Sequence, residues 1–313
     1  MRLLDFHGII PALVTPMIDE YTVDFDAFDS YLNWIIEQGV IGVAVNVDTG
    51  EGPTLERSER RELIKTAKDR LGSSGVLVTG AIGSSTRDIK IEAKIAKDSG
   101  ADVALVFPNI GFRGDPLNPT ALKEHYQEIA DYADIDLMLF LLQDALGGIH
   151  YDKASMGAVA SIDRLVAVKE ATFDISKFKE TLSFFREIEK SNNREIAFLT
   201  GNDNFILESF IWNCDGALIG AAAQDTKRIV ECFKASTEGN WGKAIGLSHM
   251  LQPLVDAVFA PPVRNYRARI KACLYLQGVI PRKVVRPPLI GVPEHELDYW
   301  RKILKVAGLN VER

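Results

Sequence analysis

The strongest constraint on the fold of this chain is an alternation between short apolar runs and amphipathic segments. Eight runs rich in β-branched side chains recur through the first two thirds of the sequence. They span residues 9–15, 41–47, 76–81, 102–107, 137–142, 165–169, 196–200 and 217–220. Nearly all are continuously apolar, which is typical of parallel strands covered on both faces.

The segments between these runs show helical periodicity. Residues 25–38 place apolar side chains on one helical face, and further helices are expected at 56–71, 88–99, 119–132, 175–189 and 204–213. Eight strands alternating with helices predict a (β/α)8 TIM barrel more than an open doubly wound sheet, which is the alternative.

Residues 225–313 contain helical patterns at 226–235, 243–258, 264–276 and 293–304 but no further strand pattern. We therefore expect a barrel over residues 1–224. The last barrel helix and a C-terminal helical region, packed on the barrel, should occupy residues 225–313. Trp241 and Trp300 in this region need a surface to bury against, which could be the barrel wall or another subunit.

Charge and composition exclude several classes of partner. The chain carries 36 basic and 43 acidic residues, and no Lys or Arg run could follow a phosphate backbone, so we expect no nucleic acid partner. No segment approaches about 18 consecutive apolar residues, and the N-terminus lacks a signal sequence, so we expect a cytoplasmic protein without a membrane partner. The three cysteines and five histidines lack ligand spacing, and we expect no metal and no cofactor.

Lys169 is the foremost candidate for chemistry. It ends the sixth apolar run, and the carboxyl ends of the strands carry the active site of such barrels. Desolvation there would lower the pKa of its amine and leave a neutral nucleophile. The alternatives are an ion pair with Glu170 or a side chain that reaches solvent.

Polar loops follow other predicted strands at the same rim. Asp48, Thr49, Gly50 and Glu51 come after the second strand, where a hydroxyl and backbone N–H groups in a tight turn could hold a carboxylate. The segment 201–203, Gly-Asn-Asp, follows the seventh strand and could bind substrate hydroxyls or simply cap a helix.

Over essentially its full length the chain resembles the dihydrodipicolinate synthase and N-acetylneuraminate lyase family. The opening segment 8–16, GIIPALVTP, is similar to the family's first strand, and Thr49-Gly50-Glu51 to the end of its G-T-T-G-E loop. The segment 169–172, KEAT, resembles its Schiff-base motif. Residues 100–102, 201–203 and 286–289 also match in order.

The resemblance implies a lyase that forms or cleaves a C–C bond of pyruvate or another 2-oxo acid. It also implies a homotetramer or homodimer. Lys169 would be the nucleophile, while Thr49 and the amides around Gly50 and Glu51 would bind the substrate carboxylate. Further substrate contacts are expected at the rim, from Phe140, Gln143, Asn202, Asp203 and Leu218.

Three functional features of the family are missing. Phe140 stands where the fifth strand of the family ends in a tyrosine that relays protons, and Ala145 replaces the arginine that binds the second carboxylate. Asn109 and Ile110 replace a pair of tyrosines. We predict that Asp48, at the position of the relay's first hydroxyl, does the acid and base work. It could instead pair with Lys169 or cap a helix.

Three functions remain open from the sequence. The first is a 2-oxo acid aldolase or synthase acting through an imine of Lys169. The second is a dehydratase of 2-oxo-3-deoxy sugar acids that uses the same imine. The third is a non-catalytic descendant that binds an oxo acid.

Overall fold

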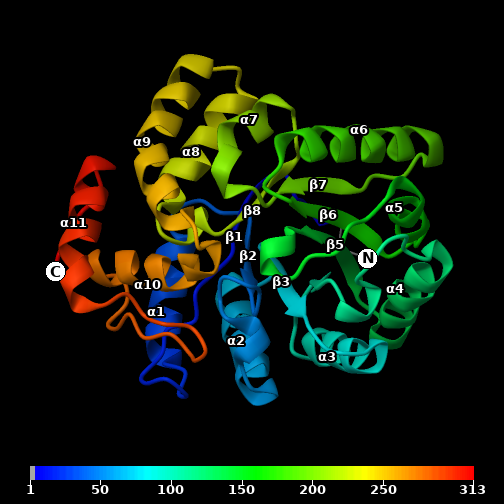
Figure 1. Cartoon of the computed structure of the whole chain (residues 1–313), viewed down its shortest axis with the longest axis horizontal. Coiled ribbons are helices and arrows are strands. Elements are labelled where there is room, and N and C mark those ends of the chain that lie inside the picture. The colour runs from blue at the N-terminus through cyan, green and yellow to red at the C-terminus, as the bar shows by residue number, and fades with distance from the viewer. Residues whose placement is uncertain (1–3) are drawn as a thin grey trace.

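The structure, a computed structural model, describes residues 4–313 and contains a barrel of eight parallel strands (Figure 1). The sheet order is β1-β8-β7-β6-β5-β4-β3-β2. The strands are β1 Gly8–Pro11, β2 Gly42–Val45, β3 Val76–Ala81, β4 Val103–Val106, β5 Asp136–Leu142, β6 Leu165–Ala171, β7 Ala197–Thr200 and β8 Gly216–Ile219. The predicted (β/α)8 barrel is confirmed.

The segment that follows β1 closes the ring. Ala12 N donates to Ile219 O of β8, whereas Leu13 N donates to Ala44 O of β2. A bridge between Ala12 and Ala44 joins the first two strands. The residues after β1 thus bond to β8 on one side and to β2 on the other, as the residues of an interior strand do.

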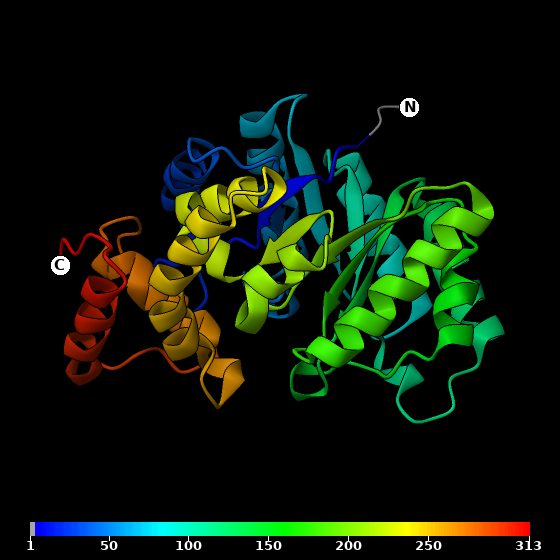
Figure 2. The same cartoon turned by 90° about the horizontal axis from the view of Figure 1, so that it is seen from above.

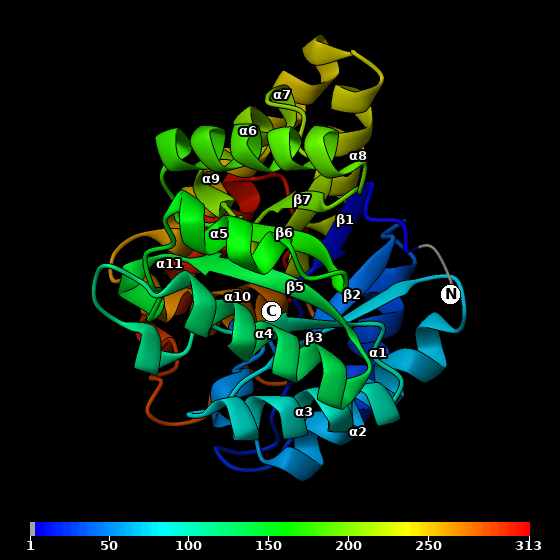
Figure 3. The same cartoon turned by 90° about the vertical axis from the view of Figure 1, so that its right-hand side faces the viewer.

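Eight helices cover the strands. They are α1 Phe25–Ile36, α2 Arg57–Leu71, α3 Thr86–Asp98, α4 Pro119–Ala133, α5 Lys153–Ala160, α6 Ile175–Asn192, α7 Ile206–Ile211 and α8 Thr226–Thr237. The side chains of Asp24, Ser85, Asn118, Asp152 and Asp174 accept hydrogen bonds from first-turn amides and so fix where five of them begin. Figure 3 shows α4, α5 and α6 side by side on the outer face.

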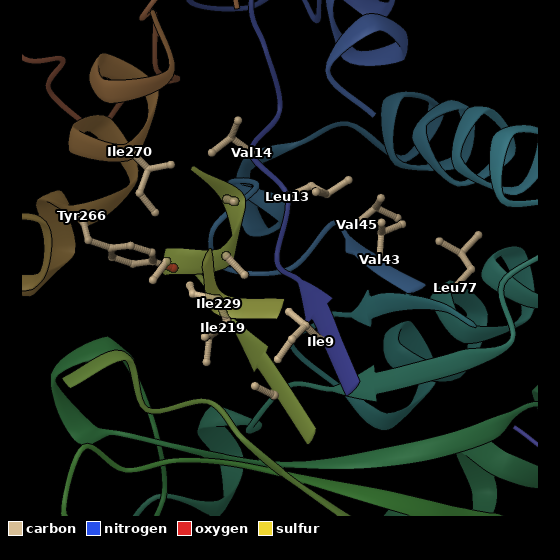
Figure 4. Close-up of a cluster of buried hydrophobic side chains, with 14 of the residues drawn as sticks. Ile9, Leu13, Val14, Val43, Val45, Leu77, Ile219, Ile229, Tyr266 and Ile270 are labelled. Carbon is tan, nitrogen blue, oxygen red and sulfur yellow. The ribbon is translucent and has the colours of Figure 1, made fainter. Parts of the chain in front are cut away.

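Apolar side chains form two layers. One layer, with Ile10, Leu105 and Met138, fills the inside of the barrel. The other lies between the strands and the helices, and part of it is drawn in Figure 4. Successive strand residues point to opposite faces, so both layers are built from the same eight runs.

Three further helices, α9 Trp241–Phe259, α10 Tyr266–Leu276 and α11 Leu297–Val306, lie together on one side of the barrel (Figures 1 and 2). Trp300 is buried there, while Trp241 is 41% exposed. The division of the chain at residue 224 stays a prediction. No helix within residues 4–313 combines the length and the apolar character needed to cross a membrane.

A buried ion pair ties α10 to the loop after β2. Lys271 of α10 pairs with Glu51, and both side chains are at most 1% exposed. Glu51 also accepts a 2.7 Å hydrogen bond from Arg286 N. The Arg286 guanidinium donates to the two carboxylate oxygens of Glu59 in α2 at 2.6 and 2.7 Å. The C-terminal region is thus joined to the barrel directly beside the loop that carries Asp48 and Thr49.

Candidate active site

Lys169 lies in β6, near its carboxyl end, and its side chain points into the barrel mouth. The residue is only 7% exposed. Its Nζ lies 4.5 Å from the centroid of the Phe140 ring on β5. No carboxylate of residues 4–313 lies within the 4.0 Å of an ion pair with this amine. A cavity of about 30 Å³, large enough for a water molecule, opens beside it.

Burial lowers the pKa of Lys169 to about 8, although the negative charges of Asp203 and Asp48 oppose the shift. Neutral amine, the nucleophilic form, is therefore much more abundant near neutral pH than on an exposed lysine. Asp203 shares the same cavity, and burial raises the pKa of its carboxyl group, against the Ala221 amide and the charge of Lys169.

Glu170 does not pair with Lys169, because consecutive strand residues face opposite sides. Its carboxylate accepts hydrogen bonds from Asn202 Nδ2 at 2.5 Å and from Thr172 N at 3.1 Å. Burial raises the pKa of Glu170 to about 7. Asn202 also accepts a hydrogen bond from Phe173 N at 2.7 Å and is completely buried. This predicted substrate contact therefore joins the loops after β6 and β7.

Asp48 lines the cavity, but its carboxylate is bound by α10 and not by Lys169. Arg267 pairs with Asp48 Oδ1, and its Nε donates to Asp48 O at 2.8 Å. The hydroxyl of Tyr266 donates to Asp48 Oδ2 at 2.7 Å. Neither of the alternatives weighed for Asp48, a pair with Lys169 or a helix cap, describes this arrangement.

The amides that could bind a carboxylate in the turn after Asp48 are not the two that the sequence suggested. Gly50 N donates to Val47 O and Glu51 N donates to Asp48 O, both at 3.1 Å. Both amides are therefore used within the turn itself. Within residues 4–313, the amides of Asp48 and Thr49 have no hydrogen-bond acceptor, and the Thr49 hydroxyl lies beside them in the cavity wall.

Tyr266 is a site residue that the sequence did not indicate. Its hydroxyl lies 3.2 Å from Thr49 Oγ1 as well as 2.7 Å from Asp48 Oδ2. Figure 4 shows its side chain reaching from α10 toward the barrel. Tyr266 is separated from Asp48 by 218 residues, and nothing in the pattern of α10 distinguishes its first residue from a core tyrosine.

Two other predicted contacts lie elsewhere. Leu218 of β8 is completely buried in the apolar layer inside the barrel. Gln143 lines a separate cavity of about 550 Å³ between the ends of β5 and β6 and helices α5 and α6. The structure thus brings Lys169, Asp48, Thr49, Phe140 and Asp203 together around one small cavity, whereas the side chains of Glu51 and Asn202 serve the surrounding framework.

The chain is similar to known proteins over nearly its full length. A model of the dihydrodipicolinate synthetase family matches residues 5–307. The 4-hydroxy-tetrahydrodipicolinate synthase of Desulforamulus reducens is 28% identical over 306 residues, which cover 97% of this chain and 98% of that protein.

Solved structures share the fold. Dihydrodipicolinate synthase from Thermotoga maritima has a TM-score of 0.87 at 24% identity, covering 97% of this chain and 99% of that one. The chloride-inhibited enzyme from Acinetobacter baumannii, solved with pyruvate, has a TM-score of 0.82 at 25% identity, covering 98% and 100%. Because the family model spans nearly the whole sequence, the resemblance is confirmed: this chain is a lyase that belongs to the dihydrodipicolinate synthetase family.

Proposed function

We propose that Lys169 condenses with pyruvate and that the resulting imine supports formation or cleavage of a C–C bond. The observation that carries this proposal is a buried amine that is free of any carboxylate partner within residues 4–313 and faces a cavity. Pyruvate is the molecule bound in the related Acinetobacter baumannii enzyme, which supports it as the 2-oxo acid here.

The carboxylate of pyruvate would bind to the amides of Asp48 and Thr49 and to the Thr49 hydroxyl. The neutral amine of Lys169 then attacks C2, and the carbinolamine loses water to give a protonated imine. Loss of a proton from C3 yields an enamine, whose electron pair attacks the carbonyl carbon of an aldehyde. Water finally attacks C2 and releases the product and the amine.

A group other than Phe140 must donate and accept the protons in these steps, because a phenyl ring has no ionisable proton. Tyr266, Thr49 and Asp48 form a continuous chain of hydrogen bonds at the cavity wall. We propose that this chain moves protons to and from the substrate, with the Asp48 carboxylate as its acid and base. Replacing Asp48 by Asn should cut turnover by a factor on the order of 100 or more.

The test of the imine is reduction by borohydride in the presence of pyruvate, followed by peptide mass analysis. We expect a reduced pyruvyl adduct on Lys169 and none in a Lys169→Met variant. An unmodified Lys169, in protein shown to be folded, would overturn the proposed function and favour a binding-only descendant.

Self-association is a second part of the proposal. Large apolar side chains are exposed on α9 and α11, among them Trp241, Ile245, Met250, Tyr299 and Val306. Exposed apolar side chains gathered on neighbouring helices favour contact with another copy of the chain, as a homodimer or homotetramer. Sedimentation velocity tests this, and a monomer at micromolar concentration would contradict it.

A further inference from the structure

The opening of the Lys169 cavity has an apolar rim. Leu146 comes from the short helix η3 (Asp144–Leu146) after β5, and Phe173 from the turn after β6. Phe259 ends α9, and Val263 begins η6 (Val263–Asn265). All four side chains are partly exposed, and η3 and η6 lie side by side, so these residues form the passage between the cavity and solvent.

Phe173 is held in this rim by a strained backbone. Its φ of 61° is in the left-handed region, which bulky residues rarely adopt unless their surroundings fix them. Two side chains of the β7–α7 loop supply that fixation: Asn202 Oδ1 accepts from Phe173 N at 2.7 Å, and Asn204 Nδ2 donates to Phe173 O at 3.1 Å.

The rim continues inward as a row of aromatic rings. The Phe173 and Phe259 centroids are 6.1 Å apart, and Phe259 stacks on Tyr266 at 5.2 Å with an interplanar angle of 22°. The row therefore leads from the solvent to the hydroxyl of Tyr266. Offset and tilted rings at these separations are the geometry in which one more aromatic ring packs favourably.

Few of the residues that line the cavity are charged. Among the described lining residues the only cation is Lys169, and the anions are Asp48 and Asp203. Arg267 is nearby but is committed to Asp48. Among the residues that line the cavity, a second substrate with its own carboxylate would find no cation left to pair with, although exposed Arg264 adjoins Val263 in η6. A polyhydroxylated substrate would leave its hydroxyl groups without partners against the rim.

We propose that the rim formed by Leu146, Phe173, Phe259 and Val263 is a subsite for the aryl group of an aromatic aldehyde. This inference rests on the proposed function of Lys169. The pyruvate enamine forms a bond from C3 to the aldehyde carbon, and the aldehyde oxygen takes a proton from the Tyr266 hydroxyl, which is replenished from solvent through the relay. Hydrolysis of the imine releases a 4-aryl-4-hydroxy-2-oxo acid, so atoms and electrons balance without an oxidant.

The test compares aldehydes at fixed pyruvate. We expect kcat/KM for benzaldehyde to exceed the values for isobutyraldehyde, glyceraldehyde and succinic semialdehyde by about tenfold or more. Higher values for a charged or hydroxylated aldehyde, equal values for isobutyraldehyde, or no turnover of any aldehyde would each overturn the subsite.

A substitution in the rim tests whether the rim causes the preference for benzaldehyde. Phe173→Gly suits the left-handed backbone, so it should fold while removing the ring. We expect it to lose about tenfold in kcat/KM for benzaldehyde, whereas Tyr132→Ala, an exposed aromatic on α4, should keep the preference. Unchanged benzaldehyde kinetics in Phe173→Gly would contradict the proposal.

Failure of this proposal can be told from failure of the imine chemistry. Borohydride trapping of pyruvate on Lys169 involves no aldehyde. A wild-type protein that traps pyruvate but does not prefer benzaldehyde retains the proposed function and loses only the aryl subsite. A protein that does not trap pyruvate loses both.

Discussion

Gly201 controls the position of the reactive amine. A Cβ added at this residue would lie 2.7 Å from Lys169 Cε, 2.7 Å from Ala171 Cβ and 3.1 Å from Glu170 O. Ordinary carbon–carbon contacts are about 3.5 Å or longer, so each carbon contact is short by about 0.8 Å. The flexible Lys169 side chain can move away from the first contact, but Ala171 and Glu170 belong to strand β6, so the other two contacts also require a shift of the backbone at Gly201.

Gly201→Ala should therefore fold but react slowly. Overpacking of this kind costs about 1–3 kcal/mol of unfolding free energy. A displacement of about 1 Å at a reacting atom can cost about 100-fold in rate. We expect the rate of borohydride-dependent trapping of pyruvate on Lys169 to fall by about that factor, because the amine no longer faces the carboxylate-binding amides of Asp48 and Thr49.

The assay follows adduct formation by peptide mass against time, alongside urea unfolding. Gly246→Ala is the matched control, because nothing lies within 4 Å of a Cβ at that position of α9. This control should trap pyruvate at the wild-type rate and gain about 0.5–1 kcal/mol in stability. A Gly201→Ala protein that traps as fast as wild type would refute the reasoning about the Lys169 side chain.

Three further perturbations separate the parts of the site. Labelling of Lys169 by trinitrobenzenesulfonate should reach half its maximal rate near pH 8 and fall about tenfold per pH unit below it, because only the neutral amine reacts and burial lowers its pKa to about 8; a midpoint near 10.5 would contradict the burial argument. Tyr266→Phe should slow turnover by about 100-fold while pyruvate trapping persists, with Tyr275→Phe of the same helix as control; equal turnover in both variants would remove Tyr266 from the relay. Lys271→Met leaves Glu51 buried without its cation and should lower the unfolding free energy in urea by about 3–5 kcal/mol, whereas exposed Lys305→Met should change it little; a loss under 1 kcal/mol would contradict the expected cost of leaving the Glu51 charge uncompensated.

The strands and Lys169 were predictable because their signals are local. Eight continuous apolar runs specify strands covered on both faces, and the strand that ends at the KEAT motif fixes which rim the lysine occupies. Helix α5 was not predicted. It has only eight residues, contains Gly157 and lacks a charged outer face, so its periodicity is too weak to read.

The other half of the site depends on contacts that sequence spacing does not reveal. Asp48 and Arg267, Glu51 and Lys271, and Thr49 and Tyr266 are each separated by more than 200 residues. Tyr266 and Lys271 are buried in α10 and Arg267 is partly buried, but the helical pattern does not name their partners, which are set only when the C-terminal helices pack on the barrel. The same holds for Asn202, whose partners are Glu170 in strand β6 and Phe173 in the turn after it.

Helix α10 touches the loop after β2 at three points: through Tyr266, Arg267 and Lys271. A tilt of this helix would move the proton relay and the carboxylate-binding turn as one body while Lys169 stays fixed in β6. Any event that shifts the C-terminal helices, including association with another copy through α9 and α11, would therefore change the distance between nucleophile and relay. The barrel supplies the nucleophile Lys169, and helix α10, outside the barrel, sets the position of the proton relay relative to it.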